Sequence, residues 1–162
     1  MQADLERCYI AALRILKYRF NSEFELRRKL AAKKFERPDI DATIVRLRDE
    51  KWLDDARFAG AFVRTRHSKR IGSRRIVREL HAAGVDDDTA RTAIRENTDP
   101  EREREDLQNE YLKRRRLLIG RHGSDYVDTA EGRNKITMYL LKQGYDASLI
   151  HSVVKELPVV DD

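Results

Sequence analysis

The chain has 162 residues, of which 39% are charged and 40% are hydrophobic, so its length allows one domain or two small ones with modest cores. A single cysteine excludes an intrachain disulfide framework, and seven glycines and three prolines are few for an all-β protein. No stretch approaches the roughly 18 apolar residues of a membrane span, and the start lacks an apolar run long enough for a secretory signal. Because apolar residues recur at spacings of three and four, we expect a cytoplasmic, all-α protein.

The first part of the chain predicts three helices. The first covers about residues 4 to 18, and its apolar stripe includes Cys8, which we interpret as a core thiol. Ser22 followed by Glu25 is a capping box that starts a second helix. The carboxylate of Asp39 suits the beginning of a third helix, where it complements the positive end of the helix dipole.

The middle of the chain predicts three more helices. The first starts near Asp54, and the second follows Gly72. Gly84 then occupies a C-cap position, where a left-handed backbone is least costly for glycine. The carboxylates at 86–88 mark the start of the next helix.

The last part predicts a third set of helices. Asp99 and Pro100 form an N-cap followed by proline at the first helical position. Residues 119–132 have the composition of one long loop, after which Gly132 opens a helix and Gly144 ends it.

The three sets are copies of one unit. Segments that begin at Ser22, Gly72 and Gly132 align without gaps, with offsets of 50 and then 60 residues. The aligned apolar positions are Leu26/Ile76/Ile136, Leu30/Leu80/Leu140, Phe35/Val85/Tyr145, Ile40/Ala90/Ile150 and Ile44/Ile94/Val154. The glycine turn recurs in the second and third copies, whereas the first has Lys34 there. We therefore predict three tandem three-helix repeats, at 1–52, 53–98 and 99–162, stacked in an elongated, curved array.

The charges are distributed unevenly along the chain. Residues 62–78 hold seven Lys/Arg and no carboxylate, and residues 113–121 hold five and none, whereas residues 86–110 hold ten Asp/Glu against four Arg. Such segregation is typical of proteins with polyanionic partners. The candidate binding residues form a basic stripe of Arg64, Arg66, Lys69, Arg70, Arg74, Arg75 and Arg78, with Arg27, Arg28 and Lys29 in the first repeat and Lys113, Arg114, Arg115 and Arg116 as secondary candidates.

A helical wheel supports a functional interpretation of the stripe over a merely solvated face. Arg74, Arg75 and Arg78 fall within an arc of about 100°, opposite Ile76 and Leu80. This face lacks nearby acids for internal pairing. Its arginines are therefore expected to point outward and to stay available to a partner.

The sequence gives no indication of catalysis. The four histidines show no metal-ligand spacing with one another or with Cys8, and there is no phosphate-binding loop or nucleophile elbow. We expect no cofactor, no metal and no enzymatic activity. Trp52, between Leu47 and Phe58, is interpreted as a plug between repeats in preference to a stacking platform.

Two quoted stretches resemble the RecX family of recombinase regulators. They are "LDDARFAGAFVRTR" at 53–66, followed by Gly72-x-Arg74-x-Ile76 and Glu79-Leu80, and "SEFELRRKL" at 22–30. The resemblance implies a modulator that binds the RecA recombinase, lies in the groove of its nucleoprotein filament, and suppresses strand exchange and ATP hydrolysis. It also implies tandem three-helix repeats, from which Lys34 departs where glycine is common. We expect the chain to be a monomer.

Two other functions compete with this interpretation. A helix-turn-helix reader would place the start of its last helix between phosphates, where residues 86–88 would be repelled, so operator binding is disfavoured. A general module that binds single- or double-stranded DNA, or a helical repeat that binds an acidic protein, stays open.

Overall fold

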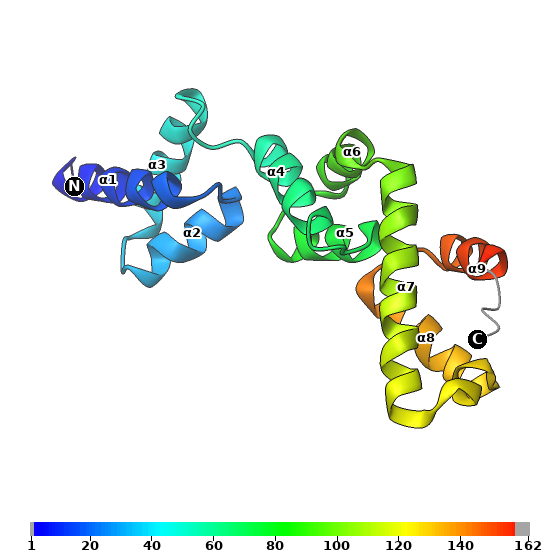
Figure 1. The fold of residues 1–162 in the computed structure, drawn as a ribbon. Coiled ribbons are helices and arrows are strands. Elements are labelled where there is room, and N and C mark those ends of the chain that lie inside the picture. Colours follow the sequence, from blue (N-terminus) through cyan, green and yellow to red (C-terminus); the bar gives the residue numbers. More distant parts are fainter. Residues whose placement is uncertain (1, 158–162) are drawn as a thin grey trace. The chain divides into compact units, whose positions relative to one another are not determined.

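The computed structural model describes residues 2–157, which form nine α-helices and one 3-10 helix without any β-strand (Figure 1). The all-α prediction is therefore confirmed. The helices are α1 (Gln2–Tyr18), α2 (Glu23–Ala32), α3 (Arg37–Asp49), α4 (Asp55–His67), α5 (Ser73–Ala82), α6 (Asp87–Asn97), α7 (Pro100–His122), η1 (Ser124–Asp128), α8 (Ala130–Gln143) and α9 (Ala147–Glu156).

The helices belong to two compact units, and the boundary between the units falls within α4 and α5. One unit comprises Met1–Phe62 and Glu79–Glu96, and the other comprises Val63–Arg78 and Asn97–Asp162. Helices α1, α2 and α3 pack against one another in the first unit, and their core includes the fully buried Cys8. The interpretation of Cys8 as a core thiol is confirmed, and burial raises the pKa of this thiol.

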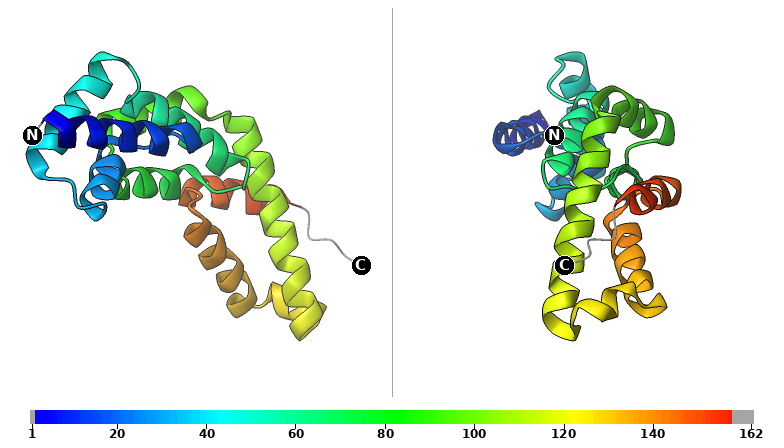
Figure 2. Two further views of the ribbon diagram at one scale, coloured as in Figure 1. Left: turned by 90° about the vertical axis from the view of Figure 1, so that its left-hand side faces the viewer. Right: turned by 45° about the vertical axis from the view of Figure 1, so that its right-hand side comes forward.

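The second unit is organised around the long helix α7. Helices α8 and α9 and the short η1 all pack against α7, and Figure 2 shows α8 and α9 beside it in both views. The side chains that fill this core include Leu107 of α7, Leu140 of α8 and Val153 of α9, each of them fully buried.

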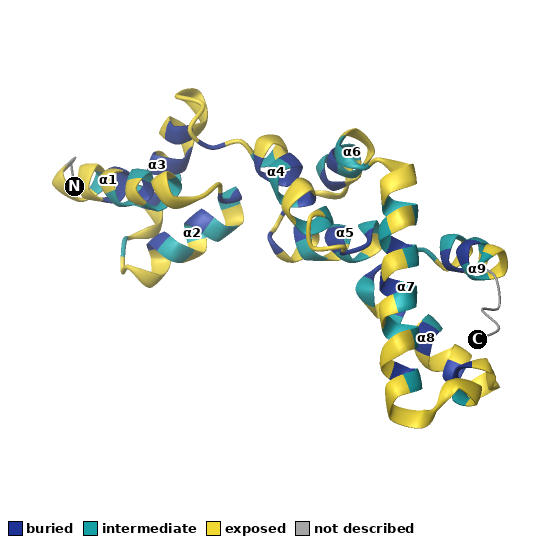
Figure 3. Cartoon of the chain, in the orientation of Figure 1, coloured by how far each residue is buried: buried dark blue, intermediate teal, exposed yellow. Residues whose placement is uncertain are grey.

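The repeat alignment agrees with the burial pattern. Buried residues follow one side of each helix in Figure 3, and Leu30, Leu80 and Leu140 are each 0% exposed. At the last aligned apolar position Ile44 is buried as predicted, whereas Ile94 and Val154 are only partly buried. In the second and third copies the buried residue is the one immediately before that position, Ala93 or Val153, and in the first copy Thr43 is buried together with Ile44.

The prediction of a long loop at 119–132 was wrong. Helix α7 continues to His122, η1 covers 124–128, and α8 begins at Ala130 with Thr129 as its N-cap. The polar composition of this stretch concealed two local anchors. Val127 is buried in the core of the second unit, and the Thr129 hydroxyl accepts a hydrogen bond from the Gly132 amide at 3.0 Å.

The prediction that Trp52 is a buried plug was also wrong, since 54% of its surface is exposed. Lys51 adopts a positive φ of 59°, and the amides of Trp52 and Leu53 both donate to the Leu47 carbonyl. This turn directs Leu53 into the core of the first unit, where it is 5% exposed, and leaves the indole at the surface.

The turn that follows α5 receives the beginning of α2 in the first unit. The Ser22 hydroxyl, which accepts a hydrogen bond from the Glu25 amide as predicted, also donates to the Ala83 carbonyl. The Glu25 carboxylate pairs with Arg19 at 3.0 Å, so the reciprocal half of the capping box is replaced. Gly84 has φ 80°, and a Cβ at this residue would overlap the Cβ of Phe24.

The turn that follows α8 receives the beginning of α5 in the same way, within the second unit. The Gly72 amide donates to the Gln143 carbonyl and the Arg74 amide to the Gly144 carbonyl, both at 3.0 Å. Gly144 has φ 98°, and a Cβ there would overlap the backbone and Cβ of Arg75. The two glycines therefore serve both a left-handed turn and a close approach of a neighbouring helix.

Candidate functional site

The candidate site is the basic stripe of α4, α5 and the residues between them. Arg74 and Arg78 of α5 are exposed and Arg75 is half-buried, whereas Ile76 and Leu80 on the opposite side are 0% exposed. The expected outward orientation of these arginines is confirmed. Helix α5 is positioned by its fixed N-terminus, because the Ser73 amide and hydroxyl both donate to Glu103 of α7.

Arg70 is held in place by carboxylates of α7. Its guanidinium lies 3.4 Å from Asp106 and 3.7 Å from the nearly buried Glu110. The backbone of Arg70 has φ 55°, and its carbonyl accepts a hydrogen bond from the Tyr145 hydroxyl at 2.8 Å. Burial first, and then the charges of Asp106 and Glu110, raise the pKa of Tyr145, so this hydroxyl stays a donor.

Arg74 and Arg75 contact the turn between α8 and α9. Arg74 pairs with Asp146 at 3.4 Å, and Arg75 donates to the Gln143 side chain at 3.4 Å. Asp146 is also the N-cap of α9, and hydrogen bonds from Ser148 lower its pKa. The side chains of Arg74 and Asp146 are 62% and 47% exposed, so their pairing is weak and screened by solvent.

The expectation that the stripe lacks carboxylate partners was therefore wrong. The carboxylate partners belong to α7 and to the start of α9. These elements are far from the stripe in the sequence, so an inspection of neighbouring residues does not find them. One signal was available in the sequence. Glu103, Asp106 and Glu110 recur at spacings of three and four residues and therefore share one face of α7. An acidic stretch that is only solvated has no need of such a shared face.

Two cations of the stripe make neither an ion pair nor a side-chain hydrogen bond with any residue in the range 2–157. These are Lys69 and Arg78, and both are exposed. Arg64 donates to the Asn97 side chain at 2.6 Å, and Arg66 is half-buried and interacts with its neighbours. Lys69 and Arg78 are consequently the members of the stripe whose charge is most available to a partner.

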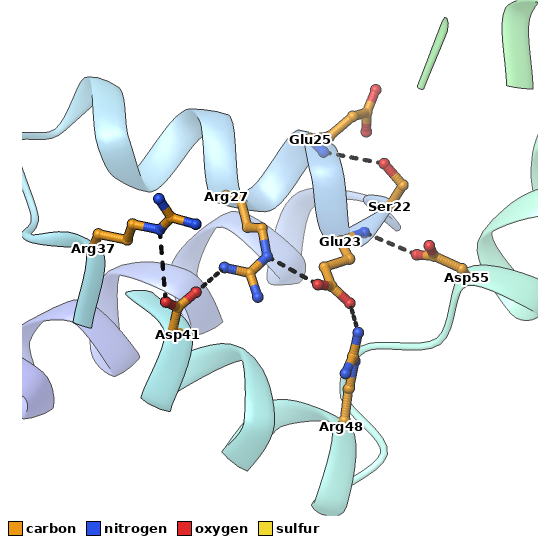
Figure 4. A network of polar contacts seen from close by, with 8 residues as sticks. All are labelled: Ser22, Glu23, Glu25, Arg27, Arg37, Asp41, Arg48 and Asp55. Atoms are coloured by element: carbon orange, nitrogen blue, oxygen red, sulfur yellow. Dashed lines mark hydrogen bonds and ion pairs between the residues drawn. The ribbon is translucent and has the colours of Figure 1, made fainter. Parts of the chain in front are cut away.

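The basic residues of α2 differ in availability, as Figure 4 shows for Arg27. Arg27 pairs with Glu23 at 2.9 Å and with Asp41 of α3, and Glu23 also pairs with Arg48. Burial opposes the charge of Arg27, but the hydrogen bonds to both carboxylates outweigh it and raise the pKa. Arg27 thus links α2 to α3.

The other two basic residues of α2 are not alike. Lys29 donates to the Asn21 side chain at 2.6 Å, and burial followed by repulsion from Arg19 lowers its pKa. Arg28 is exposed and has no ion-pair partner in the described part of the chain. Only Arg28 of this trio resembles Lys69 and Arg78 in availability.

The secondary candidates lie on the second half of α7. Lys113 is 4.0 Å from Glu110, and the guanidinium of Arg114 lies 4.9 Å from the centre of the Tyr139 ring. Arg115 and Arg116 are without ion pairs over the residues that the structure covers. This part of α7 therefore carries more uncompensated charge than the α2 trio does.

Other kinds of site find no support in residues 2–157. No group of three or more His, Cys, Asp or Glu side chains is arranged to hold a metal ion there. Within the same range, no helix combines the length and the apolar character that crossing a membrane requires.

The comparisons with known proteins all lead to one family. The model described as "RecX, first three-helix domain" matches residues 8–47, and "RecX, second three-helix domain" matches residues 54–94. "Regulatory protein RecX" of Xanthomonas oryzae pv. oryzae is 32% identical over 146 residues, covering 89% of this chain and 84% of that protein. The chain belongs to the RecX family. The resemblance noted in the two quoted stretches is thereby confirmed.

The family likeness extends beyond the two matched domains. "Regulatory protein RecX" of Oceanobacillus iheyensis is 29% identical over 98% of this chain, but the chain spans only 56% of that relative's length. It spans 58% of the length of two Bacillus relatives. The crystal structure of RecX from Lactobacillus salivarius superposes with a TM-score of 0.81 at 27% identity, covering 97% of this chain and 98% of that one. The RecX fold thus includes α7, α8 and α9, which neither family model matches.

Proposed function

We propose that this chain is a non-enzymatic regulator that binds the RecA recombinase and its nucleoprotein filament and inhibits strand exchange and ATP hydrolysis. Its RecX relatives are named regulatory proteins, which supports a regulatory role. The observation that carries the proposal is the segment 62–78, with seven cations and no carboxylate, in which Lys69 and Arg78 stay unpaired within the described residues. We further propose that the chain acts in the cytoplasm as a monomer built from the repeats 1–52, 53–98 and 99–162.

The physical basis of the proposal is charge complementarity. A filament presents closely spaced DNA phosphates, and Arg side chains bind phosphates through a planar fork that makes two charge-assisted hydrogen bonds. Lys69 adds a flexible point charge beside them. Because the carboxylates of α7 hold Arg70 in one orientation, this arginine is pre-organised, and a partner need not immobilise it on binding.

The alternative is a general nucleic-acid-binding helical module. The cationic segment alone fits both functions, since phosphates attract it whether or not a recombinase is present. The alternative predicts equal affinity for bare DNA and for a filament. The favoured function predicts a preference for the filament.

Co-sedimentation distinguishes the two functions. The chain should be mixed with bare single-stranded DNA, with the recombinase alone and with the assembled, ATP-bound filament, and the pelleted fraction measured in each case. Preferential pelleting with the filament supports the proposal. Equal binding to bare DNA would replace it with the general DNA-binding function.

A matched pair of variants tests the stripe itself. Lys69→Ala combined with Arg78→Ala removes two charges that support nothing else in the described fold, whereas Arg74→Ala would also remove the contact with Asp146. If these residues bind phosphates, the slope of log affinity against log salt should decrease by about 0.7–0.9 for each lost contact. Arg95→Ala, an exposed arginine of α6 outside the candidate set, is the control and should leave the slope unchanged.

A further inference from the structure

A second surface of the molecule has a different chemistry from the basic stripe. A groove between α7 and α8 has a largely apolar floor and a basic rim. Met138 is 58% exposed, and it lies beside Tyr139 and Leu141 in this groove. The cations that line the groove are Arg114, Lys135 and Lys142.

Arg114 is fixed in this groove without a carboxylate partner among the described residues. Its guanidinium lies over the Tyr139 ring at 4.9 Å, and its Nε is buried without a hydrogen-bond acceptor. The Tyr139 hydroxyl donates to Glu110 at 2.7 Å, so the ring that supports Arg114 cannot turn away. The free edge of this guanidinium is thus pre-organised to receive an anionic group.

Lys142 and Lys135 extend the positive charge along α8. Each lies about one turn of helix from Met138 and on the same face, because the three residues are at positions 135, 138 and 142. Lys135 is paired with Glu131 at 3.0 Å, whereas Lys142 is exposed and has no ion pair in residues 2–157. Met138 is therefore flanked by Lys135 and Lys142 on α8, and Arg114 of α7 lines the same groove. Of these three cations, Lys142 and Arg114 make no ion pair within the described residues.

The groove suits a protein better than a nucleic acid. Nucleobases bind to proteins by stacking on exposed aromatic faces. Tyr139 is the one aromatic residue that lines this groove, and Arg114 already covers its ring. The accessible floor is a thioether and aliphatic carbon, which pack against apolar protein side chains, and Met adapts readily to such partners.

We propose that this groove binds an acidic amphipathic segment of a protein, with an apolar side chain on Met138 and carboxylates on Arg114 and Lys142. The proposal rests on the proposed function in one respect, namely that the protein is a recombinase subunit of the filament. The groove of α7 and α8 would then contact protein, and the stripe of α4 and α5 would contact DNA. A helix laid in a groove with apolar anchors and flanking charges is a common mode of such recognition.

Site-specific photo-cross-linking tests the proposal. Met138 is replaced by p-benzoylphenylalanine in the full chain, the protein is irradiated with the assembled filament, and the cross-linked species are identified. We expect a covalent adduct with a recombinase peptide that contains Asp or Glu beside apolar residues. Adding Lys142→Glu should reduce the yield of this adduct, whereas Arg133→Glu, on the same helix but outside the groove, should leave it unchanged.

The remaining outcomes separate this inference from the proposed function. An adduct with DNA, or no adduct although the chain co-sediments with the filament, would overturn the inference and leave the proposed function intact. Equal yields from the Lys142→Glu and Arg133→Glu proteins would overturn the role of charge in the groove. If the parent chain does not co-sediment with the filament, the proposed function is lost and this inference with it.

Discussion

Leu30, Leu80 and Leu140 occupy the same place on the middle helices α2, α5 and α8, and each is 0% exposed. A fully enclosed leucine is surrounded by close-packed atoms that relax only partly when the side chain is removed. The loss therefore combines transfer of apolar surface with the formation of a cavity.

Replacing any one of these leucines by alanine should lower the free energy of unfolding by about 2–5 kcal/mol. Urea titration of each single variant measures this change. Val45→Ala on α3, where the side chain is 53% exposed, is the control and should have a much smaller effect. A near-zero effect at one of the leucines would contradict its equivalence to the other two.

The sequence alone predicted the burial of these leucines, but it did not predict the environment of every residue. The leucines follow from helical periodicity, because a buried stripe must recur at three and four residues. The exposure of Trp52 could not be predicted in this way. It depends on the positive φ of Lys51, and lysine is not a typical residue for that conformation. The pairing of Arg74 with Asp146 was hidden because it joins α5 to the start of α9.

At the scale of helices and turns, the glycine turns carry the most constraint. Gly84 and Gly144 each combine a positive φ with the close approach of a preceding helix, Phe24 at one and Arg75 at the other. Lys34 occupies the corresponding turn after α2 and also has a positive φ, of 67°. Its side chain is tolerated because it is exposed.

Gly84→Ala should destabilise the protein by more than about 1 kcal/mol, because alanine at this φ is strained and its Cβ would overlap Phe24. Lys34→Gly should be neutral or stabilising, since it relieves a left-handed lysine at the cost of greater freedom in the unfolded chain. Thermal unfolding of both variants checks the contrast. Equal destabilisation by the two changes would mean that the approach of α2 does not matter.

The beginning of α6 depends on one carboxylate of the acidic trio. Asp86 accepts hydrogen bonds from the amide and the hydroxyl of Thr89, at 2.9 and 2.7 Å, and these bonds lower its pKa. Asp87 pairs instead with Arg91 and His81. The predicted helix-start role therefore belongs chiefly to Asp86.

The lowered pKa gives this cap a defined pH dependence. Since the carboxylate is more acidic when folded, it stabilises the protein above its unfolded pKa of about 3.9, and this stabilisation is lost as the pH falls through the folded pKa. Asp86→Ala should thus be less stable than the parent at pH 7 and approach it below about pH 4. Asp88→Ala is the control, because the Asp88 side chain makes no hydrogen bond or ion pair within the described residues. A difference that does not change with pH would exclude the cap as its cause.

At the scale of the whole molecule, the sequence predicted the helical class and the order of the elements. The recurrence of one apolar pattern explains why this succeeded, because the aligned positions appear three times along the chain. The prediction of a loop at 119–132 failed for the opposite reason. This stretch occurs once, so no second copy revealed that Val127 is a core residue.

The elongated, curved shape expected from tandem repeats stays a prediction, and solution scattering tests it. A compact chain of this length would have a radius of gyration of about 15 Å. We expect a clearly larger value for the monomer, because stacked repeats extend along one direction. A value near that of a compact chain would contradict the array.

The contacts at Gly84 and Gly144 also give each three-helix group two different ends, one that donates a helix start and one that receives it. This difference bears on how repeats are added to such proteins or lost from them. The middle group, α4 to α6, offers Gly72 to the turn after α8 and receives Ser22 and Phe24 at its own turn, so it carries both halves of the junction. A tandem duplication of residues 53–98 would therefore supply matching surfaces at both ends without any new contact having to evolve. A copy joined ahead of α1 would instead meet Lys34, where a side chain stands in the position that a neighbour needs. The middle group thus carries both halves of the junction, whereas the turn after α2 has a lysine side chain where the other two turns have glycine.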